Sequence, residues 1–288
     1  MINKITIKNG VRIIDNDYVV KNKKNDVGSM YNYLLSRSFN YFPEIIREDN
    51  ERIYYKYIPD ILEPKEQKMI DLTSLLALLH NKTTFYKEVD LDYYKYIYES
   101  VNQEIDDTYN YYNNLMDNIE NEIYMSPANY LIARNISFVY SSLVYAKENI
   151  KKWYELIEDK RRVRLVTIHN NLKLDHYIKN DKPYLVSWDN AKIDMPIYDL
   201  ISLYKNNYLD FDFNDIFKLY LSKYSIRPEE MTLFLSIIAI PDKIKYTGSE
   251  YKTVLSVRRI IDYVYKTQEL LKEYGIKQET NKTQKFDK

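Results

Sequence analysis

The chain of 288 residues contains no cysteine, and this absence excludes two kinds of site. Without thiols there is neither a disulfide framework nor a thiolate-ligated metal centre. Only three histidines remain beside the carboxylates, and their spacing matches no zinc-site pattern. Because cysteine-free chains are compatible with a reducing compartment, we expect a cytoplasmic location.

Long apolar runs and a surplus of charge are also missing. The longest apolar run, residues 231–240, is much shorter than the about 20 residues of a membrane-spanning helix. The first ten residues, MINKITIKNG, lack the apolar core of a signal peptide. Lys plus Arg and Asp plus Glu both number 42, which removes a global electrostatic reason for binding nucleic acid. We therefore expect neither a membrane nor a nucleic-acid partner.

Glycine and proline are scarce, with 4 and 8 residues, whereas tyrosine is abundant, with 32. Together with frequent Asn, Lys and Ile, this bias is typical of an AT-rich genome such as that of a low-GC bacterium. We interpret the tyrosines as packing residues before any aromatic binding surface. The length allows one two-lobed unit or two small domains.

The first sixty residues favour short strands around one helix. Strands are predicted at residues 2–7 and 11–14, on either side of the turn residues Asn9 and Gly10, and at 18–22. A helix with three-four spacing follows over residues 27–37. Two further strands, 44–47 and 52–58, precede Pro59 and Pro64, which mark a connection into helical sequence.

The rest of the chain is mainly helical. Ser126 and Pro127 form a strong helix start, so the apolar stripes on either side predict two long antiparallel helices. We interpret these stripes as residues that pack in the core, and the alternative is that they form a groove that binds a partner. The other predicted elements are a helix at 65–83, a strand at 164–168, a strand pair at 178–180 and 184–188, and helices at 215–223, 228–240 and 250–273.

The segment from His169 to Leu200, HNNLKLDHYIKNDKPYLVSWDNAKIDMPIYDL, carries the most informative motif. It resembles the aminoglycoside phosphotransferase and choline kinase-like family of the protein-kinase-like superfamily, which has spore-coat kinase-like relatives. That family has a loop His-Gly-Asp-(x)4-Asn, followed by Ile-Asp-Trp and Pro-x-Tyr-Asp-Leu. The resemblance implies an α+β, two-lobed kinase-like fold. Its parts would be an antiparallel N-lobe (1–60), a helical C-lobe (61–275) with a helical hairpin (91–158) and the catalytic segment (164–200), and a disordered tail (276–288).

Aligned without gaps, the scaffold residues of this motif agree and the chemical ones differ. His169 matches the loop histidine, Asn171 falls on the catalytic Asp, and His176 falls on the metal-binding Asn. Ser187 falls on the metal-binding Asp. The residues that agree are Trp188, Ala191, Ile193, Pro196, Tyr198, Asp199 and Leu200.

These differences bear directly on phosphoryl transfer. Asn171 can orient an acceptor hydroxyl but cannot take its proton, and losing a general base costs roughly 10²- to 10⁴-fold in rate. Ser187 is neutral and His176 offers nitrogen, so neither suits the hard cation Mg²⁺. Two carboxylates, Asp175 and Asp189, could substitute. If residues 184–189 form a strand, Asp189 shares a face with Ser187 and is the better candidate.

Three other residues have predicted structural roles. His80, at the end of the helix over 65–83, is expected to make hydrogen bonds rather than bind a ligand. His169 is expected to bond to backbone groups, as the resemblance implies. Asp199 lies early in a helix and is expected to fasten the catalytic loop through backbone N–H groups.

Lys21 occupies the place of the strand lysine that pairs with nucleotide phosphates in this superfamily. The helix at 27–37, which would supply its Glu partner, contains no Glu. The phosphate-covering loop is reduced to Lys8-Asn9-Gly10, and a tight turn presents few N–H groups to phosphate.

Three functions remain open. The leading hypothesis is a kinase-like pseudoenzyme, a binding or scaffold module with little or no phosphotransfer. The alternatives are an active small-molecule kinase that uses Asp175 or Asp189 and a structural spore-coat-type protein. No cofactor is assigned, although ATP and Mg²⁺ would be required for activity, and the partner is an unidentified small molecule or protein.

Overall fold

The computed structural model describes residues 5–8, 11–23 and 25–275. The turn expected at Asn9 and Gly10, the strand start at residues 2–4 and the tail predicted for 276–288 lie outside the described residues. By compactness the chain divides into two units. The first comprises residues 1–90 and 160–226, and the second comprises residues 91–159 and 227–288.

The first unit begins with the predicted succession of three strands, a helix and two strands. The strands form a five-stranded antiparallel sheet in the order β1-β2-β3-β5-β4. Their bounds are β1 (Ile5–Lys8), β2 (Val11–Ile14), β3 (Tyr18–Asn22), β4 (Ile45–Glu48) and β5 (Arg52–Lys56), with α1 (Val27–Ser36) between β3 and β4. Strand β5 lies between β3 and β4, and its alternate residues Ile53 and Tyr55 are buried on one face of the sheet.

The same unit continues through α2 (Lys65–Thr83) to a second, three-stranded sheet in the order β10-β7-β6. Its central strand β7 (Arg162–Ile168) is buried along almost its whole length, as its β-branched sequence predicts. The edge strands β6 (Phe85–Glu88) and β10 (Lys192–Asp194) were not predicted, because they are short and become strands only by pairing with β7. A hairpin of β8 (Tyr177–Lys179) and β9 (Pro183–Leu185) and two helices, α5 (Ile197–Asn207) and α6 (Phe213–Lys223), complete the unit.

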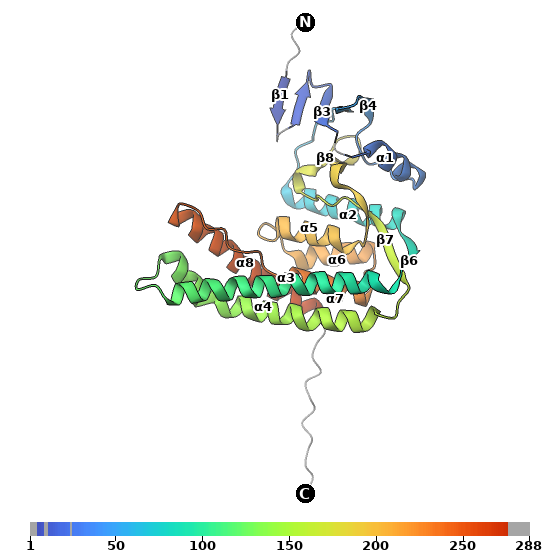
Figure 1. Cartoon of the computed structure of the whole chain (residues 1–288). Helices are drawn as coiled ribbons and strands as arrows, with labels where there is room; N and C mark the ends of the chain where they lie inside the picture. The colour runs from blue at the N-terminus through green and yellow to red at the C-terminus, as the bar shows by residue number, and fades with distance from the viewer. Residues whose placement is uncertain (1–4, 9–10, 24, 276–288) are drawn as a thin grey trace. The chain divides into compact units, whose positions relative to one another are not determined.

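The second unit is helical. The predicted antiparallel pair is present as α3 (Leu91–Glu120) and α4 (Pro127–Ile157), and Ser126 caps α4 by accepting the backbone N–H of Asn129. Helices α7 (Pro228–Ile238) and α8 (Glu250–Tyr274) pack on α4. Figure 1 shows α3 and α4 side by side, joined by a loop at one end. Across the described residues, no helix is both long enough and apolar enough to cross a membrane.

Candidate functional site

Two residues with left-handed backbone lie in the segment that resembles a catalytic site. Asn170 has φ 56° and Ser187 has φ 70° and ψ 50°. Asparagine tolerates this region, which explains how Asn170 can occupy the glycine position of the family motif. Serine has no such preference, and strained backbone of this kind is characteristic of functional sites. The backbone at Asn170 and Ser187 is therefore held by the surrounding structure in a conformation that most side chains do not favour.

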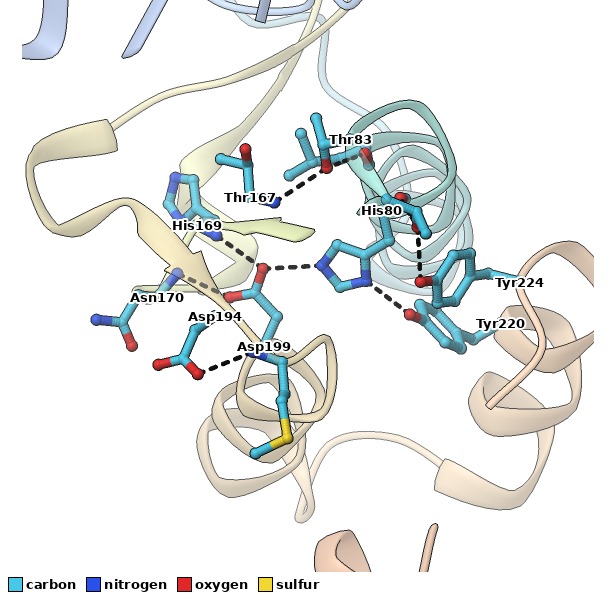
Figure 2. A network of polar contacts seen from close by, with 12 residues as sticks. His80, Thr83, Thr167, His169, Asn170, Asp194, Asp199, Tyr220 and Tyr224 are labelled. Carbon is cyan, nitrogen blue, oxygen red and sulfur yellow. Dashed lines mark hydrogen bonds and ion pairs between the residues drawn. The ribbon is translucent and has the colours of Figure 1, made fainter. Parts of the chain in front are cut away.

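Asp199 fastens this loop to the helix behind it (Figure 2). Its carboxylate is fully buried and accepts the backbone N–H of His169 through Oδ2 and that of Asn170 through Oδ1, both at 2.7 Å. The predicted role of Asp199 is confirmed. Charge-assisted bonds of this kind are stronger than neutral ones, so the loop backbone is rigidly placed.

His80 supports Asp199 from α2. Its Nε2 lies 3.2 Å from Asp199 Oδ2, and its Nδ1 lies 2.6 Å from the hydroxyl oxygen of Tyr220. The imidazole is fully buried, and Figure 2 shows it between Asp199 and Tyr220. With Nε2 donating to the carboxylate, Nδ1 accepts the tyrosine proton. His80 is thus the hydrogen-bonding residue that its sequence position predicts.

His169 is held as a neutral structural residue. Its Nε2 donates to the backbone carbonyl of Val186 at 2.9 Å, and its buried Nδ1 has no hydrogen-bond partner among the described residues. Burial lowers the pKa of His169 to about 4, although the nearby Asp199 opposes the shift. The imidazole therefore orients the segment before Ser187 and is not available as a general base.

A cleft of about 390 Å³ lies between the five-stranded sheet and the catalytic segment within the first unit. Its apolar wall comprises Ile13, Val19, Tyr55, Ile58, Ile178 and Val186. Its charged groups are four lysines and two aspartates: Lys21, Lys56, Lys68, Lys173, Asp60 and Asp175. This combination of an apolar wall and a few polar groups is typical of small-molecule sites, and the cationic surplus favours an anionic ligand.

Lys21 reaches across this cleft to the position of the family's metal-binding Asp. Its Nζ lies 2.9 Å from Ser187 Oγ and 3.0 Å from Asp189 Oδ2. Asp189 therefore supplies the carboxylate that α1 lacks, and the lysine and Asp189 side chains are both largely buried. The lysine predicted to hold phosphate is here engaged by the protein itself.

The prediction that Asp189 lies near Ser187 is right, but the predicted strand over residues 184–189 is wrong. Strand β9 ends at Leu185, and residues Trp188–Asn190 form a 3₁₀ turn. Asp189 approaches the site because the left-handed Ser187 redirects the chain, and not through strand alternation.

Of the other predicted site residues, His176 and Asp175 line the cleft and Asn171 does not. His176 lies in the cleft, where its Nδ1 donates to the backbone carbonyl of Asn171 at 2.6 Å. Burial lowers the pKa of His176, so its Nε2 is an unprotonated acceptor at neutral pH. Asp175 is exposed and also lines the cleft. Asn171 takes part through its backbone and does not line the cleft.

The donor set at the family's metal positions does not fit Mg²⁺. The Ser187 hydroxyl faces the ammonium group of Lys21, and His176 offers nitrogen, whereas Mg²⁺ requires hard oxygen ligands in an octahedral arrangement. An ammonium 2.9 Å from the hydroxyl would also repel a divalent cation. Within the described ranges no group of three or more His, Asp or Glu side chains could hold a metal ion.

Comparison with solved structures decides the fold. An aminoglycoside phosphotransferase from Alicyclobacillus acidocaldarius is similar with a TM-score of 0.71 at 8% identity, covering 94% of this chain and 91% of that one. This chain has the aminoglycoside phosphotransferase fold. Spectinomycin phosphotransferase, in complex with ADP and spectinomycin, is similar with a TM-score of 0.53 at 11% identity over 93% of both chains. A glucosamine kinase is similar with a TM-score of 0.53 at 11% identity, covering 91% of this chain and 75% of that one.

The predicted resemblance and the α+β, two-lobed kinase-like fold class are thereby confirmed at the level of the fold. No protein-family model matches the sequence, and no curated protein matches it either.

Sequence reasoning missed four of the charged residues of the cleft, namely Lys56, Lys68, Lys173 and Asp60. Lys is common throughout the chain, so its frequency carried no signal. Lys173 could have been found, because it lies inside the loop between Asn171 and His176. Lys68 Nζ pairs with Asp60 Oδ2 at 2.8 Å, a contact between the connection after Pro59 and α2 that spacing alone does not reveal.

Proposed function

We propose that this chain is a kinase-like pseudoenzyme, a binding module for a phosphorylated small molecule that transfers phosphate poorly or not at all. The observation that carries the proposal is the contact of Lys21 with both Ser187 and Asp189. Where an active site of this fold needs a metal-bound carboxylate, this chain has a hydroxyl under an ammonium group. The positive charge at this position is the ammonium group of Lys21 and not a metal ion.

The cleft supports a nucleotide as the ligand class. Its apolar wall suits a base, and Lys173 provides positive charge for phosphates without a divalent ion, whereas Lys21 and Lys68 are paired with Asp189 and Asp60. One solved structure of this fold has ADP and spectinomycin bound. Similar structures described as kinases motivate the choice of ATP as the first probe.

The alternative is an active small-molecule kinase that uses Asp175. This carboxylate lines the cleft and is exposed, whereas Asp189 is tied to Lys21. Asp175 is therefore the better placed of the two to act as a base if the reaction occurs. Transfer of labelled phosphate from ATP to aminoglycosides, choline and amino sugars tests this function.

ATP is expected to raise the thermal unfolding midpoint to the same extent with Mg²⁺ and with a chelator, because lysines carry the phosphate charge. Lys173→Met should reduce this shift several-fold, since it removes a cation from the cleft. Lys218→Met, on an exposed face of α6, is the matched control and should leave the shift unchanged. A shift that appears only with Mg²⁺ would contradict the proposal.

Asp189→Asn separates the two functions. It removes a negative charge beside Lys21, so ATP should bind several-fold more tightly, as measured by calorimetry. Labelled-phosphate transfer should stay at background in the wild type, in Asp189→Asn and in Asp175→Asn. Turnover by the wild type that either substitution abolishes would show an active kinase.

A further inference from the structure

The loop between α3 and α4 exposes consecutive apolar side chains. Ile123 is 90% and Tyr124 89% exposed, and Met125 is also exposed. We call Ile123, Tyr124 and Met125 the tip, which lies at the end of the hairpin in Figure 1. Single exposed apolar residues are ordinary, but three in succession at a projecting end are characteristic of an interaction site.

The base of the tip is held by a polar network. Asn129 donates through Nδ2 to both carboxylate oxygens of Glu122, at 2.9 and 3.0 Å, and accepts the hydroxyl of Tyr246 at 2.9 Å. Glu250 accepts the backbone N–H of Ala128 at 2.7 Å. The exposure of the tip is thus a feature of an ordered loop, because both of its flanks are fixed by buried or charge-assisted bonds.

The loop that carries the tip is itself acidic. Residues 117–130 include Asp117, Glu120 and Glu122 and contain no Lys or Arg. Glu250 adds a carboxylate beside the base of the tip, on a segment that also carries Lys245 and Lys252. This charge disfavours an anionic membrane surface and favours a partner whose apolar groove has a cationic rim.

Such a groove is present between α4 and α8 of the same unit. Two adjoining cavities of about 260 and 300 Å³ share Asn135, Ile261 and Asp262. Phe138 and Tyr265 are exposed along its apolar wall. Arg134 and Arg258 lie at its other end, and neither has an ion pair within the described residues. The groove thus combines an apolar wall with two available cations, partly offset by Asp262.

The distance between the tip and the groove allows two copies of the chain to place their tips in each other's grooves at the same time. The groove is lined from Leu131 to Val139 of α4, which begins at Pro127, so it starts roughly 6 Å and ends roughly 18 Å along that helix. Two copies lying antiparallel, with their hairpin ends overlapping by this length, would each place a tip in the groove of the other. A two-fold arrangement of this kind is self-complementary and closes, so it makes a dimer and not a filament.

We propose that the chain forms a homodimer in which the tip of each copy occupies the α4–α8 groove of the other. Ile123 and Tyr124 contact the wall formed by Phe138, Ile261 and Tyr265. Glu120 lies near Arg134 and Arg258. One tip in one groove buries a small surface area. The two-fold symmetry doubles that area toward the roughly 1,200–2,000 Å² that specific interfaces typically bury.

The test measures the mass of the full chain in solution by light scattering and sedimentation. The wild type is expected to be a dimer that weakens with added salt, because the Glu–Arg contacts are screened. The tip variant Ile123→Ser/Tyr124→Ser and the groove variant Arg134→Glu/Arg258→Glu should each weaken the dimer at least tenfold. Tyr96→Ser, which removes an exposed tyrosine elsewhere on α3, is the matched control and should leave the mass unchanged.

Mixing the two variants distinguishes this arrangement from other dimers. The tip variant keeps an intact groove and the groove variant keeps an intact tip, so their mixture retains one native contact and should form a 1:1 complex that neither forms alone. Unchanged circular dichroism would show that all variants fold. A monomeric wild type at every concentration, or a dimer insensitive to both variants, would overturn the proposal and leave another protein as the occupant of the tip.

Discussion

Asp199→Ala is expected to lower the free energy of unfolding by about 3–5 kcal/mol, a large effect for one substitution. The carboxylate is fully buried and accepts two backbone N–H groups of the catalytic loop, with His80 Nε2 beside it. Alanine would leave the His169 N–H and His80 Nε2 unpaired in the interior, and each such donor costs about 1–3 kcal/mol, whereas the N–H of the exposed Asn170 can turn to water. Urea unfolding followed by circular dichroism measures the loss.

Asp212→Ala is the matched control for this prediction. Asp212 caps α6 and accepts one backbone N–H, that of Asn214, at an exposed position. Its removal should cost only about 1 kcal/mol. If Asp199→Ala does not fold, amide exchange at His169 and Asn170 in Asp199→Asn provides the second measurement, since an amide nitrogen cannot accept an N–H. Protection equal to that of the wild type would show that Asp199 does not hold the loop.

Acidification is expected to remove up to about 3 kcal/mol of stability between pH 6.5 and 4 through His169 alone. The pKa of His169 falls to about 4 in the folded chain, from an ordinary value of 6.5, because the ring is buried. Between these values the unfolded state binds the proton and the folded state does not. His169 therefore has no pH-dependent effect above pH 6.5, and it favours the unfolded state increasingly as the pH falls toward 4.

The measurement compares the pH dependence of unfolding in the wild type and in His169→Gln, which keeps a side-chain donor for the Val186 carbonyl but does not titrate. The wild-type slope should exceed that of the variant by up to about 1.4 kcal/mol per pH unit within this window. The difference cancels contributions from His176, whose lowered pKa acts in the same direction. Equal slopes would mean that folding does not lower the pKa of His169.

The N-terminal strand order and the long helical hairpin could be predicted because local signals marked them. Ser126 followed by Pro127 starts α4 through a side-chain cap and a proline at the first helical position. The sequence of α5, with Asp199 in its first turn, likewise revealed how the loop is fastened. These signals act over a few residues, so they can be read without knowledge of the packing.

The edge strands and the position of Asp189 could not be predicted in the same way. β6 and β10 are strands only because β7 lies between them and satisfies their backbone groups. Asp189 was expected on a strand, but the left-handed backbone of Ser187 starts a 3₁₀ turn there. Neither outcome has a local signal in the residues concerned, because serine carries no preference for this conformation.

The amino-acid sequence by itself determined which side chains align with the chemical positions of the family motif: an amide at 171, an imidazole at 176 and a hydroxyl at 187. The identity of a residue does not depend on folding, so the sequence alone predicts that these positions lack carboxylates. Only the tertiary structure decided what replaces them. Lys21 and Asp189 are 168 positions apart, and the sheet and the catalytic segment must pack before their charges can meet at 3.0 Å.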